Sequence, residues 1–280
     1  MEVWPGRLPP APADLHAACS DAEGLLCLLT DRIDAALLAA APVLRAVSVM
    51  AVGVDNVDLA ACSARGIQVG HTPGVLTDTT ADLAFGLLIA AARRIAEGER
   101  DARAGRYEVW DPGGYLGEEV HGATLGIVGM GRIGSAVARR GEGFGMEVIH
   151  TGELPLDELL GRADFVSLHV PLRDDTRGLI GERELRLMKP TALLVNTSRG
   201  EVVETDALVR ALREGWIAAA ALDVTDPEPL PAGHPLLDLA LVTPHIGSAS
   251  RRTRELMASM AVDNLLAGLR GERMPHLANP

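Results

Sequence analysis

Gly126-Ile127-Val128-Gly129-Met130-Gly131-Arg132-Ile133-Gly134 is the stretch that decides the fold, and it lies near the middle of the chain. An apolar run over Thr124–Val128 precedes it and a helical pattern follows, which predicts a strand, a tight turn and a helix. Gly129, Gly131 and Gly134 have the G-x-G-x-x-G spacing of dinucleotide-binding turns. In such turns the glycines allow a tight bend, close approach of a pyrophosphate, and close packing of helix on strand. The motif alone is a weak indication, because glycines end strands in many proteins.

The position of this turn predicts the domain organisation. Over a hundred residues precede it, with their own short strand–helix–strand pattern. Alternating strands and helices build parallel sheets, so we expect an α/β protein of two Rossmann-like, doubly wound parallel-sheet domains. The dinucleotide-binding domain, residues 73–250, is then inserted into a substrate (catalytic) domain of residues 1–72 and 251–280.

The pattern of apolar and turn residues predicts the individual elements. A proline-rich start over residues 1–13 and a glycine-rich arm over residues 105–118 are expected to be irregular. A helix over residues 77–94 is apolar on nearly every side, which indicates burial between domains or subunits. Strands are expected at 24–29, 44–49, 67–69, 124–128, 147–151, 164–168, 192–196, 218–222 and 240–243. Other helices are expected at 34–40, 59–65, 132–142, 156–161, 182–188, 204–214 and 253–269.

Composition limits the class of protein. Hydrophobic residues make up 48% and charged residues 23%, as in soluble globular proteins. A net charge of −12 argues against nucleic-acid and anionic-membrane partners, which need basic patches. Cys19, Cys27 and Cys62 sit in apolar contexts without metal-ligand spacing, which predicts buried, reduced thiols in a cytoplasmic protein and no metal. The sequence shows no apolar run of membrane-spanning length and no signal-peptide pattern at its start.

Three chemically distinct side chains follow strands of the second predicted sheet. Arg199, Glu228 and His245 come after the strands expected at 192–196, 218–222 and 240–243. Taken singly, each has an ordinary structural interpretation, as a surface charge, a turn residue and a helix cap. Ligands of open parallel sheets bind at the carboxyl ends of the strands. Three such groups there, beside a dinucleotide turn, point to a reaction site.

Each of these side chains suits one part of the reduction of a 2-keto acid. The planar guanidinium of Arg199 can bind a substrate carboxylate through two hydrogen bonds. A protonated His245 can donate its proton to the carbonyl oxygen as hydride arrives. The carboxylate of Glu228 can orient the imidazole ring and favour its charged form. We therefore predict Arg199, Glu228 and His245 as the catalytic residues.

Over nearly its whole length the chain resembles the D-isomer-specific 2-hydroxyacid dehydrogenases, most closely the glyoxylate reductase/hydroxypyruvate reductase branch. The stretches that carry the resemblance are Val52–Asn56, Thr72–Asp82, Gly126–Gly134, Asn196–Gly200, Leu222–Pro231, Thr243–Ala249 and Asp263–Glu272. It implies Arg199 as the substrate-binding arginine, Glu228 as partner carboxylate and His245 as acid/base. It also implies that the substrate contacts Val52, Gly53 and Ser248. The implied cofactor contacts are Thr80, Gly129, Gly131, Arg132, Ile133, Gly134, Gly152, Pro171, Thr197, Asp223 and Gly247.

The chain looks short against this family in three places. The family usually has a strand and a helix before the point that matches Met1, a longer connection where Gly152-Glu153 stands, and an extra turn near Leu239-Ala240. A domain without its first strand would expose an unpaired sheet edge. We therefore expect that the sequence joins segments across omitted loops, with real deletions as the alternative.

The shortening at Gly152 bears on the choice of cofactor. Enzymes that prefer NAD place an acidic residue at the end of the second strand, where it binds the ribose 2′-hydroxyl, whereas NADP-preferring enzymes lack it. Gly152 at that position favours NADP(H), whereas the adjacent Glu153 favours NAD(H). We predict NADP(H), with NAD(H) as the alternative.

Taken together, the sequence predicts an NAD(P)H-dependent reductase of small 2-keto acids, glyoxylate and hydroxypyruvate, that yields D-2-hydroxy acids. The expected assembly is a homodimer built on the helix over residues 77–94, the arm and the dinucleotide-binding domain. One alternative is another branch of the same enzymes, such as a 3-phosphoglycerate dehydrogenase. A second alternative, from a different class, is a dinucleotide-sensing corepressor, because such proteins can keep all three catalytic residues.

Overall fold

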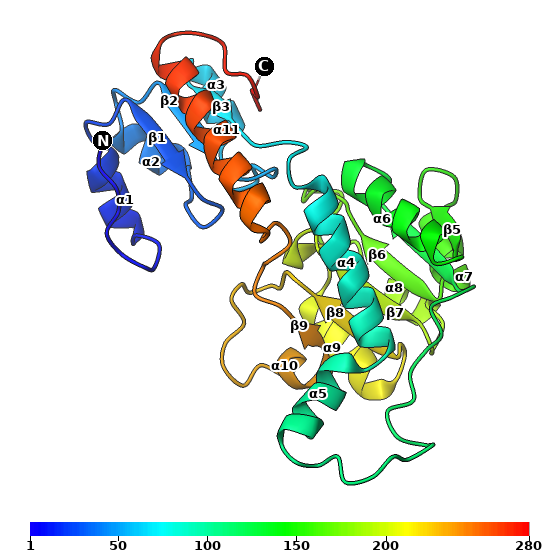
Figure 1. Cartoon of the computed structure of the whole chain (residues 1–280). Coiled ribbons are helices and arrows are strands. Elements are labelled where there is room, and N and C mark those ends of the chain that lie inside the picture. The colour runs from blue at the N-terminus through cyan, green and yellow to red at the C-terminus, as the bar shows by residue number, and fades with distance from the viewer. Residues whose placement is uncertain (280) are drawn as a thin grey trace. The chain divides into compact units, whose positions relative to one another are not determined.

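A computed structural model describes residues 1–279, which form two compact units (Figure 1). The first unit comprises Met1–Leu76 and Ala249–Pro280, and the second comprises Thr77–Ser248. Each unit contains one parallel β-sheet, which confirms the predicted pair of Rossmann-like domains. No helix within the described part of the chain is both long and apolar enough to cross a membrane.

The first unit is built on a three-stranded parallel sheet in the order β1-β2-β3. Its strands are β1 (Gly24–Cys27), β2 (Ala46–Val49) and β3 (Gln68–Gly70), and its helices are α1 (Pro12–Cys19), α2 (Ala35–Ala40), α3 (Leu59–Ala64) and α11 (Arg251–Leu269). Asp34 and Asp58 cap the amino ends of α2 and α3 by accepting main-chain N–H bonds. Near the carboxyl end of the chain, Leu277 forms an antiparallel bridge with Gly70, the last residue of β3.

Three features of this unit bear on the sequence predictions. Helix α1 begins at Pro12, inside the segment predicted as loop; proline suits the first helical turn, where no N–H bond is needed. Within residues 1–279, β1 pairs only with β2 and so forms an edge of the sheet. The three cysteines are free and buried, and burial raises the pKa of Cys27 and raises that of Cys62 to about 11. These thiols therefore stay protonated and serve as core packing.

The second unit is a six-stranded parallel sheet in the order β5-β4-β6-β7-β8-β9. Its strands are β4 (Thr124–Val128), β5 (Glu147–His150), β6 (Phe165–Leu168), β7 (Leu193–Asn196), β8 (Ala219–Leu222) and β9 (Leu241–Val242). Its helices are α4 (Thr77–Ala92), α5 (Ile95–Arg103), α6 (Arg132–Gly143), α7 (Leu156–Arg162), α8 (Glu182–Leu187), α9 (Thr205–Glu214) and α10 (Leu236–Leu239), with a 3₁₀ turn η1 (Gly200–Val202). The chain passes from β4 to β5 on one side and then to β6 on the other, so the strand order reverses at β4.

Alternate residues of the strands are buried on opposite faces of this sheet. Leu125 and Ile127 of β4 join the core cluster that contains α4 and α6, whereas Val128 joins the cluster of α7, α8 and α9. Both faces are therefore covered by helices, as strands with almost continuous apolar sequence require. In Figure 1, α4 and α6 lie together over the sheet.

Helix α4 packs on the sheet of its own unit. Its buried side chains, among them Phe85, Leu87 and Leu88, pack on α6, β7 and β8 within the same unit. The buried face of this helix is thus covered within its own unit, and the predicted contact with another domain or subunit stays a prediction. The helix also ends at Ala92, two residues earlier than predicted, and a separate helix, α5, follows it.

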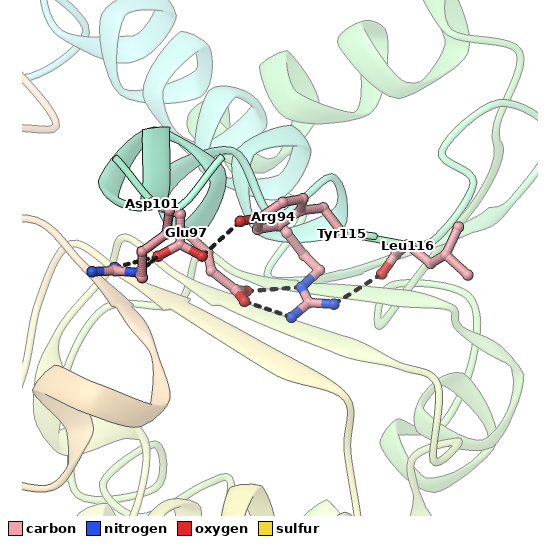
Figure 2. A network of polar contacts seen from close by, with 6 residues as sticks. Arg94, Glu97, Asp101, Tyr115 and Leu116 are labelled. Atoms are coloured by element: carbon pink, nitrogen blue, oxygen red, sulfur yellow. Dashed lines mark hydrogen bonds and ion pairs between the residues drawn. The ribbon is translucent and has the colours of Figure 1, made fainter. Parts of the chain in front are cut away.

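The arm, residues 105–118, follows α5 and returns to the end of α4, where the Glu118 N–H donates to the Ala92 carbonyl at 2.9 Å. Figure 2 shows the polar network at its base. Arg94 donates to both oxygens of Glu97, at 2.6 and 2.8 Å, and to the carbonyl of Leu116 at 3.4 Å. The Tyr115 hydroxyl donates to Asp101 at 2.7 Å. The arm is thereby attached to α5 at its base, whereas the side chains of Val109 and Trp110 at its tip are each 74% exposed.

Candidate active site

The predicted site residues of the second unit gather at the carboxyl ends of its parallel strands. The strand register aligns Leu168, Asn196 and Leu222, and pairs Leu222 with Val242. The loops that leave β6, β7, β8 and β9 therefore start side by side on one edge of the sheet. This edge, close to the point where strand order reverses, is where open α/β sheets bind their ligands.

The glycine-rich turn after β4 has the geometry that its spacing predicts. Gly129 adopts φ +97°, and a Cβ there would lie 2.8 Å from the carbonyl carbon of His169. A Cβ at Gly134 would overlap the carbonyl oxygen of Gly129, so α6 packs directly on the turn. By contrast, a Cβ at Gly131 would meet nothing within 4 Å. The turn thus leaves open space at its middle glycine, next to the first N–H groups of α6, and this fits a pyrophosphate.

A short, hydrogen-bonded connection joins β5 to α7. Gly129 N–H donates to the Thr151 hydroxyl at 3.1 Å, so the connection lies directly beside the glycine-rich turn. Gly152 N–H donates to His150 Nδ1 at 3.1 Å, and His150 Nε2 lies 3.4 Å from a carboxylate oxygen of Glu153. The chain therefore presents an acidic group one residue after the position predicted to discriminate between NAD and NADP.

The loop after β7 places Arg199. Asn196, which is 1% exposed, accepts from the N–H and hydroxyl of Ser198 at 3.0 and 2.8 Å and donates to the Arg199 carbonyl at 2.8 Å. This one amide side chain fixes the turn that carries the arginine. The Thr197 hydroxyl is buried without a hydrogen-bond partner in the described structure. An orphaned hydroxyl at a strand end fits contact with a bound polar ligand.

The loop after β8 places Glu228 between Pro227 and Pro229. Thr225 holds this loop, since its N–H donates to Glu228 Oε2 at 3.3 Å and its hydroxyl to the Pro227 carbonyl at 2.9 Å. Gly200 contacts the same loop so closely that a Cβ there would overlap the Thr225 carbonyl. The arginine loop and the glutamate loop are thus in direct main-chain contact.

The loop after β9 places His245, whose Nδ1 lies 2.6 Å from Glu228 Oε1. The His245 side chain is 29% exposed and its backbone is left-handed, with φ +52°. That conformation costs a residue with a Cβ on the order of 1–3 kcal/mol. Thr243, Ile246 and Gly247 of this loop all donate to the carboxylate of Asp223, which is 2% exposed.

Charge and burial set the ionisation of Glu228. Partial burial acts to raise the pKa of its carboxyl. The hydrogen bond and charge of His245, the Thr225 N–H and the charge of Arg199 lower it, and the net result is a lowered pKa. Glu228 is therefore ionised at neutral pH, beside the His245 imidazole and within the field of the Arg199 guanidinium. Burial lowers the pKa of His169 to about 4, and its Nε2 lies 2.8 Å from the Ser167 hydroxyl.

Two further predicted contacts lie at the same edge. Thr80, 5% exposed in the first turn of α4, faces Gly247: a Cβ at Gly247 would lie 3.5 Å from the Thr80 hydroxyl. Pro171 follows His169 and its carbonyl accepts from the Thr176 hydroxyl at 2.7 Å. Arg132 and Ile133 begin α6, with Arg132 exposed, and Ser248 ends the second unit.

Val52 and Gly53, the remaining predicted substrate contacts, belong to the first unit and follow β2. His71 Nδ1 lies 2.9 Å from the Val52 carbonyl oxygen, which fixes the peptide plane that also carries the Gly53 N–H. Sequence reasoning did not assign roles to Asn196, Thr225 or Thr243. The only sequence signal for them is a small polar residue at or just beyond a strand end.

The arrangement can bind an anion, hold a proton and accept a dinucleotide. Arg199 supplies a fixed positive charge, and the Glu228–His245 pair can keep a proton on the imidazole. The open space at Gly131, the amino end of α6 and the buried Thr197 hydroxyl fit a nicotinamide dinucleotide. Such a set of groups suits the interconversion of a carbonyl and an alcohol next to a carboxylate.

Comparison with known proteins identifies similar chains. Residues 85–247 match the family described as D-isomer specific 2-hydroxyacid dehydrogenase, NAD binding domain. A protein of Korarchaeum cryptofilum named glyoxylate reductase is 50% identical over 100% of this chain and 89% of its own. A crystal structure of a protein from Thermus thermophilus superposes with a TM-score of 0.92 at 51% identity, covering 97% of this chain and 90% of that one.

A further similarity concerns a structure with bound ligands. The NADPH-dependent glyoxylate/hydroxypyruvate reductase of Sinorhizobium meliloti, in complex with NADP and malonate, has a TM-score of 0.84 at 34% identity. The match covers 94% of this chain and 85% of that one.

Proposed function

The chain belongs to the D-isomer specific 2-hydroxyacid dehydrogenase family, and on that premise we propose that it reduces glyoxylate to glycolate with a nicotinamide dinucleotide. The observation that carries the proposal is the 2.6 Å pair of Glu228 and His245, with the charge of Arg199 acting on Glu228, at the ligand-binding edge of the sheet. Relatives from Korarchaeum, Aeropyrum and Thermococcus that are 45–50% identical carry the name glyoxylate reductase. The phosphoglycerate dehydrogenase and corepressor alternatives are therefore not favoured.

Each catalytic side chain has one proposed task. The dinucleotide, when bound, supplies the hydride that reaches the carbonyl carbon. Arg199 binds the substrate carboxylate through its planar fork of N–H donors. His245 faces Glu228 through Nδ1, so Nε2 is the atom that donates a proton to the carbonyl oxygen, leaving a neutral imidazole. Glu228 stays ionised throughout and keeps the ring oriented.

The residues proposed to contact the cofactor and substrate follow from the resemblance and their placement. On the second unit they are Thr80, Gly129, Gly131, Arg132, Ile133, Gly134, Gly152, Pro171, Thr197, Asp223, Gly247 and Ser248. Val52 and Gly53 of the first unit remain predicted substrate contacts. The open space at Gly131 and the orphaned Thr197 hydroxyl support this set most directly.

We propose NADP(H) as the preferred cofactor, with NAD(H) as the alternative. Gly152 supplies no carboxylate at the end of β5, and one similar structure was determined with NADP. The opposing feature is Glu153, whose carboxylate lies 3.4 Å from His150 Nε2 in the same turn. If Glu153 repels the 2′-phosphate, Glu153→Gln raises kcat/KM for NADPH relative to NADH.

The proposed function is tested by measuring oxidation of NADPH and of NADH with glyoxylate, hydroxypyruvate and 3-phosphohydroxypyruvate. We expect turnover with glyoxylate and hydroxypyruvate, faster with NADPH, and little with the phosphorylated acid. The His245→Ala variant is the control for chemistry at this site. No turnover of glyoxylate with either cofactor would reject the proposal.

We also propose that the protein forms a cytoplasmic homodimer through the arm. Exposed Val109 and Trp110 lie on a segment whose base is held by the network of Figure 2, and together they present an apolar surface. Two-fold assemblies place the same surface of both copies in contact. Sedimentation of Val109→Ala/Trp110→Ala at micromolar concentration should show more monomer than the wild type, whereas Leu28→Ala, at another exposed apolar side chain, should not. A wild-type monomer would contradict the proposal.

A further inference from the structure

We propose that His71 is a positioning residue for the substrate, because it holds the peptide between Val52 and Gly53 in the orientation that binds a carboxylate. The inference rests on the proposed function and on the substrate contact predicted at this peptide, and it concerns the first unit alone. His71 follows β3 and Val52 follows β2, and these neighbouring strands are parallel. The two loops therefore leave the same edge of the sheet.

The side chain of His71 makes a hydrogen bond to the main chain of the neighbouring loop. Its Nδ1 lies 2.9 Å from the Val52 carbonyl oxygen. A carbonyl oxygen can only accept, so Nδ1 carries the proton and donates it to this bond. The Thr72 N–H adds a second bond between the loops, to the Ala51 carbonyl at 2.8 Å. The loop after β2 is thus held by two of its carbonyl groups.

The N–H group on the other side of this peptide is available to a ligand. In a planar trans peptide the C=O and N–H bonds point in opposite directions, so the Gly53 N–H points away from the Val52 carbonyl and its His71 donor. Within residues 1–279 this N–H donates to no other group, and Gly53 is half-buried. Leaving such a donor without an acceptor costs free energy. A substrate carboxylate would supply the acceptor.

His71 is itself fixed by α11 and by the segment near the carboxyl end of the chain. Asn264 of α11, which is 0% exposed, donates to the His71 carbonyl at 2.8 Å and accepts from the His276 N–H at 3.0 Å. The His71 N–H in turn donates to the His276 carbonyl at 3.0 Å. A Cβ at Gly70 would lie 2.7 Å from Cβ of Asn264, so α11 packs directly on β3 at this point. Both main-chain polar groups of His71 are therefore bonded, which fixes the origin of its side chain.

A positioning role predicts a kinetic pattern that a general loss of stability does not. The substrate carboxylate is bound alike before and during the reaction, so a displaced Gly53 N–H should raise KM and leave kcat nearly unchanged. Loss of folded protein would instead lower the apparent kcat at constant KM. The affinity for the dinucleotide should stay the same, because its predicted contacts belong to the second unit.

The experiment compares His71→Leu, His71→Asn and His276→Leu in the whole chain. Leucine removes the donor to the Val52 carbonyl. Asparagine keeps a donor there, because its Nδ2 is two bonds from Cβ, as Nδ1 of histidine is. His276 is the matched control: it is a half-buried histidine of the same hydrogen-bonded cluster, but within residues 1–279 only its main chain makes those bonds.

The readouts are kcat and KM for glyoxylate, together with the dissociation constant of oxalate from the NADPH complex, measured by calorimetry. Oxalate is a dicarboxylate close in size to glyoxylate, and it tests carboxylate binding without turnover. We expect His71→Leu to raise KM and the oxalate constant about three- to ten-fold, the range for one lost hydrogen bond. His71→Asn should stay within about two-fold of wild type, since its donor is kept. His276→Leu should match wild type in both constants.

Unchanged constants in His71→Leu overturn the inference, as does an equal rise in His71→Asn or in His276→Leu. If His71→Leu does not fold, His71→Ala removes the same donor and needs no additional space. It should give the same rise, and the absence of that rise overturns the inference equally. A wild-type protein that turns over no glyoxylate with either dinucleotide refutes the proposed function itself. An active wild type with an unaffected His71→Leu refutes only the role of His71.

Discussion

The carboxylate of Glu228 lies 2.6 Å from Nδ1 of His245, although the two residues are 17 positions apart in the chain. They belong to loops that leave the neighbouring parallel strands β8 and β9, whose register pairs Leu222 with Val242. The pairing of β8 with β9 therefore brings the two loops together. Hydrogen bonds of Thr225 and Asp223 then hold the loop of Glu228 and the loop of His245 in place. The pH behaviour of the enzyme should depend on this pair.

Replacement of Glu228 by glutamine should move the alkaline limb of the reduction profile to lower pH. Reduction requires the protonated imidazole of His245, and an adjacent carboxylate stabilises that form. The readout is kcat/KM for glyoxylate as a function of pH, and direct titration of cofactor binding should show little change. An alkaline limb at the wild-type position would mean that Glu228 is only a turn residue between two prolines.

On the acid side, the lowered pKa of Glu228 predicts a stability difference that depends on pH. The folded protein keeps this carboxyl ionised below its ordinary value of 4.5. Its stabilising effect is thus fully present at pH values above the unfolded-state pKa and is lost as pH falls through the folded-state pKa. The Tm of wild type should exceed that of Glu228→Gln near neutrality, and the gap should close in strong acid. A gap that widened on acidification would contradict the assigned direction.

Arg199→Lys should lose most of the activity with glyoxylate. A lysine ammonium keeps the positive charge but cannot reproduce the two parallel N–H bonds of a guanidinium to a carboxylate. Steady-state kinetics should show kcat/KM reduced by about one to two orders of magnitude, the range for a lost charge-assisted hydrogen bond. Catalytic efficiency near the wild-type value would remove Arg199 from the proposed substrate site.

The glycine-rich turn offers a matched pair of substitutions. Gly134→Ala should destabilise the protein strongly, because a Cβ there overlaps the Gly129 carbonyl, whereas Gly131→Ala should fold normally into open space. Gly131→Ala should instead weaken dinucleotide binding, since the new methyl group occupies the space proposed for the pyrophosphate. Thermal unfolding and fluorescence titration with NADPH separate the two effects. Equal Tm values for the two variants would contradict the packing argument.

Apolar patterning located the strands of both sheets to within two residues at most ends. Apolar patterning did not predict the helices α1, α5 and α10. Helix α5 has no buried residue in the structure, so it does not contribute to the core that apolar patterning detects, and α10 is a single turn of four residues. The burial of α4 within its own unit was also not predictable, because apolarity on all sides does not specify which surface covers a helix.

The candidate site shows a similar division. Charged groups at strand ends, Arg199, Glu228 and His245, were identifiable because their chemistry is distinctive. Asn196, Asp223 and Thr225, which hold their loops, were not identifiable in that role, since a polar residue after a strand is common and its hydrogen bonds depend on tertiary contacts. The sequence therefore identifies the reacting groups more easily than it identifies the groups that hold them in position.

Gly200 has a consequence for how this enzyme can change. A Cβ at this position would overlap the Thr225 carbonyl, so no side chain fits between the loop of Arg199 and the loop of Glu228. A mutation at this single position would therefore disturb the anion-binding group and the proton-holding pair at the same time. The two loops can differ in length and sequence elsewhere. At this contact, a change in one loop requires a compensating change in the other.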